Sequence, residues 1–341
     1  MGAILIVDAF WGDSGKGKVA AYLSQHLETN FCIRAGTGTN AGHSIYFEDG
    51  RTIKTNQLPC GWLYQDTQVR VGSGVAVDPE KLFAEIEAFD ADFSLRGRTK
   101  IDFRCPIILP EYKSREAENS HLTETIGSTA SGTGVALSEF RLRQAKQAKD
   151  IPALAEYITD VAAEANAACE RGETIIIEGS QGTHLSLALS KDYPYCTSDN
   201  CTTAALADDV GLNWQHIQDV ILVVKALPSR VGEGPLPFQL SPDEEDKRGI
   251  VEYGVTTGRR RRKASQISWE HFEYAVMLNG PTQIALTFCD HFDPEIAGAR
   301  CRKDITVNIK NLIGEIEKRA NAPVTLIETG KFYEDIIDLR D

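Results

Sequence analysis

The first residues of the chain join an apolar run to a glycine-rich loop and then to a helical pattern. Residues 3–10 are apolar apart from Asp8, and WGDSGKGK at residues 11–18 follows them directly. The segment KVAAYLSQHL then carries apolar side chains at helical spacing, so we predict the order strand, loop, helix. Backbone N–H groups at such a helix start form an anion site, to which Lys16 adds a positive charge. This opening therefore predicts an α/β fold that resembles the phosphate-loop proteins.

The glycine-rich loop differs from the usual phosphate-binding loop. That form leaves four residues between its first glycine and the Gly-Lys pair, and it follows the lysine with Ser or Thr. Here only Asp13 and Ser14 stand between them, and a glycine follows the lysine. A carboxylate beside phosphates is repelled unless it binds a metal or a proton, so Asp13 is predicted to be a magnesium ligand or a general base. The alternative is a plain tight turn between strand and helix.

Strand-like and helical patterns alternate along the rest of the chain. We predict strands in QVRVGSGVAV (residues 68–77), TIIIEGS (174–180), DVILVVKAL (219–227), QIALTFCD (283–290) and APVTLIET (322–329). We predict helices in PEKLFAEIEAF (79–89), IPALAEYITDVAAEANAACERG (151–172) and VNIKNLIGEIEKRA (307–320). This alternation indicates a single large α/β domain over residues 1–341, with a mostly parallel central sheet flanked by helices. Ligands bind such sheets at the carboxyl ends of the strands, where the glycine-rich segments fall.

Composition narrows the classes of function. The net charge of -13, with 42% hydrophobic and 25% charged residues, argues against a general nucleic-acid or membrane-surface binder. An anionic substrate then needs a local basic pocket, for which RRRRK at residues 259–263 is the candidate. No apolar stretch approaches the roughly 18 residues of a membrane span, and no signal peptide is recognisable, so we expect a cytoplasmic protein. Eight cysteines without a C-x-x-C pair predict reduced thiols, not a zinc site or a disulfide framework.

Three further loops carry residue types that suit nucleotides. GTGTNAGHS at residues 36–44 contains His43, which we predict to donate to a phosphoryl oxygen, although a lone histidine is more often structural. IGSTASGTG (126–134) and EGSQGTHL (178–185), with YPYCTSDN (193–200) downstream, place hydroxyls and amides in loops, where they suit phosphates and base edges. Each loop is a weak signal alone, but several on one sheet indicate a nucleotide site.

The segment VEYGVTTGRRRR at residues 251–262 ends in four consecutive arginines. Such a run is usually a solvated face, but a Thr-Thr-Gly turn before it can direct two alternate guanidiniums into one pocket. Arginine forks match carboxylates. Arg259 and Arg261 therefore predict a dicarboxylate substrate.

Taken in order, WGDSGKGK, GTNAGH, IGSTASGTG, EGSQGT, YPYCTS, RVGEGPLP and TTGRRRR resemble the motifs of the adenylosuccinate synthetase family over nearly the whole chain. The resemblance implies the fold of that family, Mg²⁺ as cofactor and a homodimer. It also implies a ligase that couples a nucleoside triphosphate, a 6-oxopurine nucleotide and L-aspartate. The 6-oxo group is first phosphorylated, and aspartate then displaces phosphate from C6.

The resemblance assigns roles to individual residues of this chain. Asp13 is the base at the purine N1, and His43 and Gln181 complete the catalytic set. The triphosphate is implied to bind at Ser14, Gly15, Lys16, Gly17, Lys18, Gly42, His43, Asp290, Thr329 and Gly330. The purine nucleotide is implied to bind at Asp13, Ser14, Asn40, Ser128, Thr129, Gln181, Thr197 and Arg259, and at Arg143 from the partner subunit. Aspartate is implied to bind at Val255, Thr256, Thr257, Arg259 and Arg261, and magnesium at Asp13 and the Gly42 carbonyl.

Several positions depart from the family pattern. Family members normally carry Glu where this chain has Ser14, and they recognise GTP through Lys-x-Asp after LT and through a Gly-Pro near the C-terminus. Here LTFCD places Phe288 at the lysine position and keeps Asp290, while ETGKF places Lys331 at the proline position. KASQISWEHF replaces the Gly-Trp continuation after the arginines. These departures predict a change in the nucleotide ligands.

One branch of the family fits these departures, namely phage enzymes that act on dGMP and make 2-amino-2′-deoxy-N6-succinyladenylate for diaminopurine-containing DNA. The compact length and Ser14 favour this branch, because a serine hydroxyl near purine C2 can accept from the guanine amine. Asp290 can also accept the adenine amine, and Phe288 can stack on any base, so ATP or dATP is the expected donor. The alternatives are an ordinary adenylosuccinate synthetase that uses IMP and GTP, and a non-catalytic nucleotide sensor of the same fold.

Overall fold

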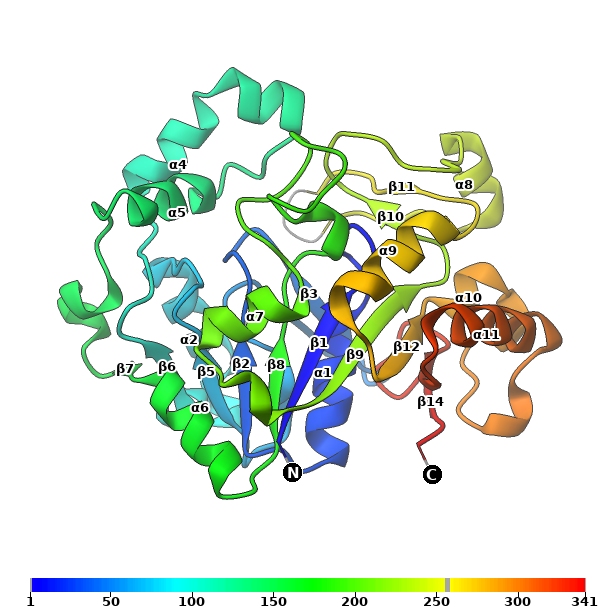
Figure 1. Cartoon of the computed structure of the whole chain (residues 1–341), viewed down its shortest axis with the longest axis horizontal. Coiled ribbons are helices and arrows are strands. Elements are labelled where there is room, and N and C mark those ends of the chain that lie inside the picture. The colour runs from blue at the N-terminus through cyan, green and yellow to red at the C-terminus, as the bar shows by residue number, and fades with distance from the viewer. Residues whose placement is uncertain (1, 255–257, 341) are drawn as a thin grey trace.

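The computed structural model of the chain describes residues 2–254 and 258–340. Within these residues the centre is a ten-stranded sheet in the order β14-β13-β12-β9-β1-β8-β2-β5-β6-β7 (Figure 1). Its neighbouring strands run parallel except for β13 and β14. The strands are β1 (Ala3–Asp8), β2 (Phe31–Arg34), β5 (Gln68–Val71), β6 (Thr99–Asp102), β7 (Ile158–Thr159), β8 (Ile175–Glu178), β9 (Ile217–Lys225), β12 (Gln283–Thr287), β13 (Val324–Glu328) and β14 (Ile336–Asp338). The mostly parallel α/β fold predicted from the sequence is confirmed.

Two antiparallel strand pairs and a set of helices surround this sheet. The pairs are β3 (His43–Tyr46) with β4 (Thr52–Thr55), and β10 (Ser229–Arg230) with β11 (Arg262–Lys263). The helices are α1 (Lys16–His26), α2 (Pro79–Phe93), α3 (Leu95–Arg98), α4 (Pro110–Ala117), α5 (Thr133–Arg141), α6 (Val161–Glu170), α7 (Thr203–Val210), α8 (Pro242–Arg248), α9 (Trp269–Asn279), α10 (Cys289–Phe292) and α11 (Val307–Ala320). The predicted order of strand, glycine-rich loop and helix is present as β1, its loop and α1.

The central strand β1 is buried on both faces, as a strand inside a parallel sheet must be. Leu5 and Val7 belong to the core that α6, α7, α9 and α11 cover. Ile4 and Ile6 belong to the opposite core, where they pack with apolar residues of α1. Figure 1 shows α6, α7 and α9 in front of the sheet. This two-sided burial explains why the apolar run of residues 3–7 has no polar interruption.

The helix predicted over residues 151–172 is wrong in its first half. Residues 152–154 form a short 3-10 turn, residues 158–159 form β7, and α6 begins only at Val161. The Asp160 side chain accepts a hydrogen bond from the Ala163 N–H at 3.0 Å and so caps the helix start. The β-branched pair before it instead joins the sheet edge next to β6. Local capping and strand pairing therefore override the helical spacing of the alanines.

The strands predicted at residues 68–77 and 283–290 end earlier than expected, at Val71 and Thr287. β5 stops at Val71, because the following residues turn so that the Val75 N–H donates to the Gly72 carbonyl at 3.1 Å. β12 stops at Thr287, because Phe288 has a left-handed backbone with φ of 54°. This change of direction leads directly into α10.

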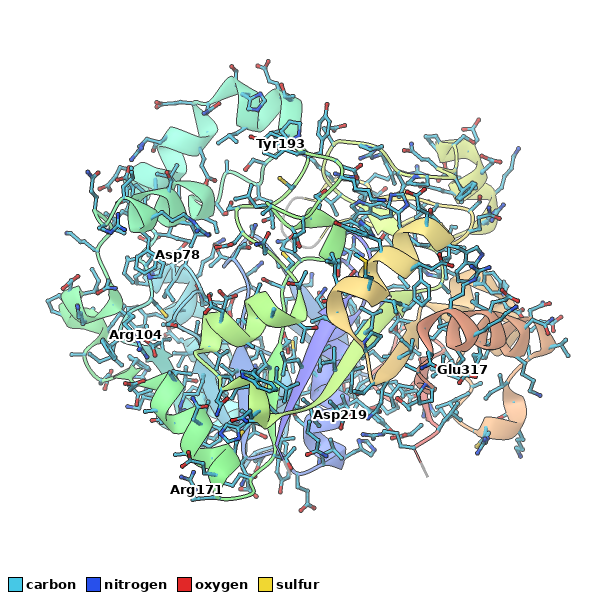
Figure 2. All side chains as sticks on the ribbon, viewed as in Figure 1. Asp78, Arg104, Arg171, Tyr193, Asp219 and Glu317 are labelled. Carbon is cyan, nitrogen blue, oxygen red and sulfur yellow. The ribbon has the colours of Figure 1, made fainter. Side chains whose placement is uncertain are left out.

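The carboxyl ends of the strands and several long loops lie at one end of the molecule. Figure 1 shows α4, α5, α8 and the β10-β11 pair at this end, and both chain termini at the opposite end. In Figure 2, Tyr193 lies at the loop end, whereas Arg171, directly after α6, lies at the other. No helix within residues 2–254 and 258–340 is long and apolar enough to cross a lipid bilayer.

Candidate active site

A cavity of about 1220 Å³ opens at the carboxyl ends of the central strands. It exceeds the roughly 300–1,000 Å³ that a site for one small molecule usually needs, so more than one ligand fits. The predicted site residues that line it are Asp13, Ser14, Gly15, Lys16, Gly17, Lys18, Asn40, Gly42, His43, Ser128, Thr129, Gln181, Thr197, Arg261, Asp290 and Gly330. The structure thus brings together loops that are far apart in the sequence.

Six predicted or implied residues lie away from the cavity or outside the described part of the chain. Arg143 and Arg259 are exposed and do not line the cavity. Thr329 is buried behind the wall, where its hydroxyl donates to the Ala299 carbonyl at 2.6 Å. The implied aspartate-binding residues 255–257 (Val255, Thr256 and Thr257) lie outside the described residues.

Four charged residues stand at the last positions of the four central strands and are all buried. They are Asp8 on β1, Arg34 on β2, Glu178 on β8 and Lys225 on β9, and we call them the strand-end charges. None was predicted as a site residue. The sequence does carry a signal, because each apolar run ends in one charged residue at the sheet edge where ligands bind.

The loop after β1 turns sharply before α1 begins. Gly12, Asp13 and Gly15 have left-handed φ values of 84°, 53° and 85°. A Cβ at Gly17 would stand 2.7 Å from the His43 Cβ, so glycine is required at this position for His43 to approach the loop. This contact explains why glycine, and not Ser or Thr, follows the loop lysine.

The two lysines of the loop hold it in place. The buried Lys16 ammonium donates to Asp8 Oδ2 at 3.0 Å and to the Gln181 carbonyl at 2.6 Å. Lys18 donates to Glu328 Oε1 at 3.1 Å and to the Gly330 carbonyl at 2.9 Å. Each lysine therefore ties the helix start to a loop after another strand, while its side chain borders the cavity.

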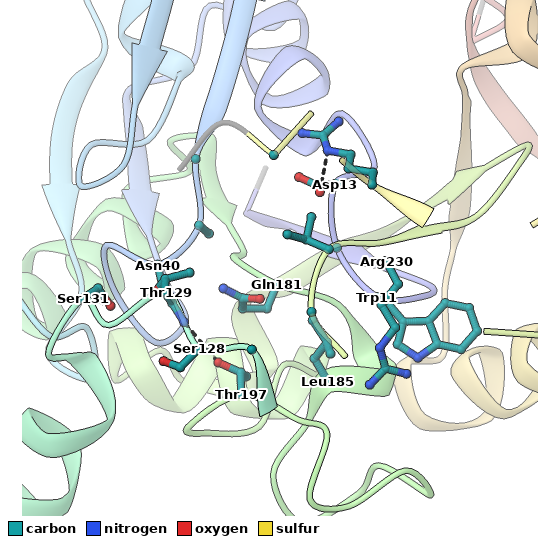
Figure 3. Close-up of a pocket in the computed structure, with 18 of the residues that line it drawn as sticks. Trp11, Asp13, Asn40, Ser128, Thr129, Ser131, Gln181, Leu185, Thr197 and Arg230 are labelled. Carbon is teal, nitrogen blue, oxygen red and sulfur yellow. Dashed lines mark hydrogen bonds and ion pairs between the residues drawn. The ribbon is translucent and has the colours of Figure 1, made fainter. Parts of the chain in front are cut away.

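Asp13 is fixed at both its carboxylate and its backbone. Its Oδ2 lies 2.8 Å from Arg261 Nε, and the Lys225 ammonium donates to its carbonyl at 3.0 Å. Figure 3 shows this ion pair together with Gln181 beside the same space. A non-glycine residue with positive φ needs such support, because the conformation is sparsely populated. The structure thus holds one carboxylate at a set position in the cavity.

Glu252 joins the positive charges behind Asp13. Its Oε2 lies 2.8 Å from the Lys225 and Lys263 ammonium groups and 3.5 Å from Arg261 NH1. Burial raises the pKa of Glu252, but these three cations outweigh it and hold the pKa well below its usual range. Burial and Lys225 lower the pKa of Lys263 to about 8. The sequence analysis gave Glu252 no role, and it included Lys263 only as the last residue of the candidate basic pocket at residues 259–263.

His43 belongs to a buried group with Arg34 and Glu178. Its Nδ1–H donates a short hydrogen bond to Glu178 Oε1, and Arg34 NH1 donates to the same oxygen at 2.7 Å. Burial, reinforced by Arg34, lowers the pKa of His43 to about 4. Glu178 holds Nδ1, and Arg34 NH1 also lies 3.2 Å from Nε2, so a ligand that binds Nε2 has to replace this arginine contact. Glu178 therefore orients His43 as the carboxylate of a catalytic triad orients its histidine.

The opposite wall carries amides and hydroxyls. The Asn40 amide donates to Thr197 Oγ1 at 3.2 Å, and Thr37 Oγ1 donates to Asn40 Oδ1 at 2.9 Å. Figure 3 shows Ser128 and Thr129 on the same side, across from Asp13. This wall offers the donors and acceptors that a heterocyclic base and a phosphate require.

The arginine run alternates between the cavity and the outside. Arg261 is buried against the cavity, whereas Arg260 pairs with Glu245 at 3.0 Å and Arg262 donates to the Gly234 carbonyl at 2.9 Å. Arg259 NH1 donates to the Gly127 carbonyl at 3.3 Å, at the loop that carries Ser128. Of the two arginines predicted to share one pocket, the structure places only Arg261 in the cavity wall.

The sheet, the glycine-rich loop at a helix start and the polar cavity define a nucleotide-binding α/β enzyme. The family model for adenylosuccinate synthetase matches residues 5–153 and 150–295. Adenylosuccinate synthetases of Thermococcus sibiricus and of a Pyrococcus species are 42% and 43% identical over 344 residues, covering 100% of this chain and 99% of theirs. The chain belongs to the adenylosuccinate synthetase family and is a C–N bond-forming ligase.

Two solved structures resemble the chain over almost its whole length. The fully ligated adenylosuccinate synthetase of Plasmodium falciparum has a TM-score of 0.90 at 23% identity, with 99% of this chain and 100% of that one covered. The succinoaminodeoxyadenylate synthetase of cyanophage S-2L, bound to dGMP and to dATP as an energy donor, has a TM-score of 0.81 at 27% identity, with 100% and 96% covered. The predicted family fold is confirmed. Compact length does not mark the phage branch, because the archaeal synthetases are equally short.

Proposed function

We propose that this ligase joins L-aspartate to C6 of a 6-oxopurine nucleotide at the cavity above β1, with IMP as the first candidate substrate. The observation that carries this proposal is the identity of 42–43% to archaeal adenylosuccinate synthetases over the entire chain. These relatives favour IMP over the dGMP that the sequence departures had favoured. The same cavity is lined by the Asp13 carboxylate and by two buried side chains, His43 and Arg261.

The proposed reaction has two steps, phosphorylation of O6 and displacement of phosphate by aspartate. Asp13 removes the proton from N1, so that negative charge moves to O6 and O6 attacks the γ-phosphoryl group in line. His43 donates to a phosphoryl oxygen through Nε2, which requires the imidazolium. The negative charge of a triphosphate favours that form, and the Glu178 carboxylate stabilises it. Phosphate is then a better leaving group than oxide, and the aspartate amine takes its place at C6.

A magnesium ion fits this arrangement. The Asp13 carboxylate and the Gly42 carbonyl both border the cavity, and they are the hard oxygen ligands that Mg²⁺ takes together with phosphate oxygens. When bound, the ion would neutralise charge on the triphosphate.

Arg261 is proposed to bind a carboxylate of aspartate. Replacing it by leucine removes a charged hydrogen-bond donor from the cavity, so the KM for aspartate is expected to rise at least about 10-fold. Arg260→Leu is the matched control, because Arg260 pairs with Glu245 outside the cavity. Steady-state kinetics with each substrate varied in turn measures the effect. Equal rises in the aspartate and purine KM values would contradict the assignment.

A second candidate substrate is dGMP, and Ser14 is the observation that favours it. Ser14 is 2% exposed, lines the cavity next to Asp13, and its Oγ has no hydrogen-bond partner among residues 2–254 and 258–340. A purine with N1 at Asp13 brings C2 near the next residue, and the guanine amine would supply the missing partner. The cyanophage enzyme, a structural neighbour of this chain, is bound to dGMP.

A substrate panel separates the two candidates. We would measure kcat/KM for IMP, dIMP, GMP and dGMP with aspartate, using ATP, dATP and GTP as donors. Preference for IMP supports the first candidate, and preference for the guanine nucleotides supports the second. In the second case Ser14→Glu should lower kcat/KM for dGMP relative to IMP at least about 10-fold, because the amine loses its acceptor and a larger charged group fills its space. Asp290 and Phe288 support ATP or dATP as the donor, and exclusive use of GTP would contradict this.

A homodimer is also part of the proposal. Arg143 is exposed and outside its own cavity, as a residue that reaches the 5′-phosphate in the neighbouring subunit must be.

A further inference from the structure

One wall of the cavity is built by α10 and by the loop after β13. Phe288, Asp290 and His291 line it together with Gly330 and Lys331. Asp290 and Gly330 are the residues for which the resemblance implied contact with the triphosphate donor. His291 was given no role, although its ring lies 5.3 Å from the Phe288 ring, centroid to centroid.

Lys263 fixes the protonation of His291. The Lys263 ammonium lies 2.9 Å from His291 Nδ1, and its other partner is the Glu252 carboxylate at 2.8 Å. An ammonium group has donors only, so Nδ1 must be the acceptor and the ring proton must sit on Nε2. Burial and the neighbouring Lys263 charge lower the pKa of His291, which keeps the ring neutral.

The contact between Lys263 and His291 also determines which edge of the imidazole ring faces the cavity. Lys263 is fully buried and does not line the cavity, so the Nδ1 edge of His291 faces the protein interior. The Nε2 edge is the one left to face the cavity. Lys263 stands directly after the arginine run, where the family pattern has its Gly-Trp continuation, so this contact belongs to a departure of this chain.

Asp290 offers a hydrogen-bond acceptor on the residue next to His291, whose Nε2–H is the donor. Its carboxylate borders the cavity and has no hydrogen-bond or ion-pair partner among the described residues. A neutral imidazole N–H and a carboxylate on adjacent residues form a donor beside an acceptor. The edge of a nucleobase presents the reverse pattern, with a ring nitrogen or carbonyl oxygen beside an amino or ring N–H. Phe288, whose ring centroid lies 4.0 Å from the Lys225 ammonium, adds an apolar surface at the same wall.

We propose that His291 binds the base of the triphosphate donor, with its Nε2–H donating to an acceptor atom on the base edge while Asp290 accepts the neighbouring N–H. This inference rests on the proposed function and names a further binding residue for its donor. Lys263 and Glu252 act behind His291 as positioning residues. The competing interpretation gives His291 only a packing role against Lys263.

The test compares three substitutions at His291. Gln can present an N–H near the position of Nε2, whereas Asn presents its amide near Nδ1 and Ala presents none. We expect Ala and Asn to raise the KM for the donor about 10-fold, and Gln to stay within about 3-fold of the unchanged protein. The KM values for aspartate and the purine monophosphate should stay within about 2-fold. His26→Ala, an exposed histidine on α1, controls for loss of an imidazole elsewhere.

Three results would overturn the inference: no rise for Ala, the same rise for Gln and Ala, or parallel rises for all three substrates. Equilibrium binding of ATP and GTP by calorimetry separates this failure from failure of the proposed function. If the unchanged protein binds neither triphosphate, the proposed function fails. If it binds one of them and all three variants bind it equally well, only the role of His291 fails. Long-range ¹H–¹⁵N correlation spectra of histidine-labelled protein should show the Nε2–H tautomer for the resonance that disappears in His291→Gln, and the opposite tautomer would also refute the inference.

Discussion

Replacing Asp13 by asparagine is expected to lower kcat at least about 10²-fold, because the proposed base for the N1 proton is lost. Asparagine has nearly the same size and tolerates the left-handed backbone that Asp13 adopts, so the loop itself should persist. The Lys225 hydrogen bond goes to the backbone carbonyl of residue 13 and is not removed. The loss can therefore be assigned to the carboxylate, and steady-state turnover under saturating substrates measures it.

Control measurements show whether the Asp13→Asn protein remains folded and still binds its ligands in the cavity. Thermal unfolding, and calorimetric binding of the triphosphate without magnesium, should remain close to those of the unchanged protein, because Asp13 is also a proposed magnesium ligand. Arg261 loses its partner at 2.8 Å, so the aspartate KM needs to be followed as well. A turnover within a few-fold of normal, in a folded protein, would show that Asp13 is not the base.

Glu178→Leu is expected to lower the free energy of unfolding by about 3–5 kcal/mol, the usual cost of leaving one member of a buried ion pair without its partner. Glu178 is fully buried and accepts from Arg34 and His43, while its second oxygen accepts from the Cys60 N–H at 2.7 Å. Without it, the buried guanidinium of Arg34 has no counter-charge. Urea or thermal unfolding monitored by circular dichroism gives the difference.

The double variant Arg34→Met/Glu178→Leu tests whether the loss of stability comes from the unpaired charge of Arg34. Replacing both charges by apolar groups of similar size should recover a large part of the lost stability, because no buried charge is left unpaired. If the double variant is as unstable as the sum of the two single ones, the pair does not behave as a buried ion pair. Turnover should stay low in either case, because His43 has lost the carboxylate that orients it.

Most of the fold could be predicted from the sequence, because its strands are buried on both faces and therefore appear as uninterrupted apolar runs. Ile4 to Val7 and Ile175 to Ile177 are such runs, and both form central strands. The prediction failed at residues 151–160, where alanines at helical spacing suggested a helix. A cap at Asp160 and the pairing of Ile158 with Ile101 decide that segment, and the latter contact is far away in the sequence.

The site could be predicted only where its residues lie within a motif. Asp13, His43 and Gln181 stand in glycine-rich loops, and the structure places all three around one cavity. Lys225 and Glu178 stand at the ends of apolar runs, which indicates the sheet edge where they lie. Their partners come from other strands and loops, so the sequence does not show which contacts they make. The arginine run shows a further limit, because Arg259 and Arg261 precede the short strand β11 and the sequence does not reveal which of them borders the cavity. The aspartate contacts assigned to residues 255–257 stay a prediction.

The position of β1 in the sheet has a consequence for synthesis of the protein. β1 lies between β8 and β9, which begin at Ile175 and Ile217, so its two neighbours are made long after it. At about 5–20 residues per second, a ribosome needs on the order of 10–40 s to add the intervening chain. Until β8 is made, this apolar strand has neither neighbour to pair with, and until β9 is made it has only one. Nascent chains that stop before β9 therefore leave one edge of β1 unpaired, and an apolar strand with an unpaired edge favours aggregation.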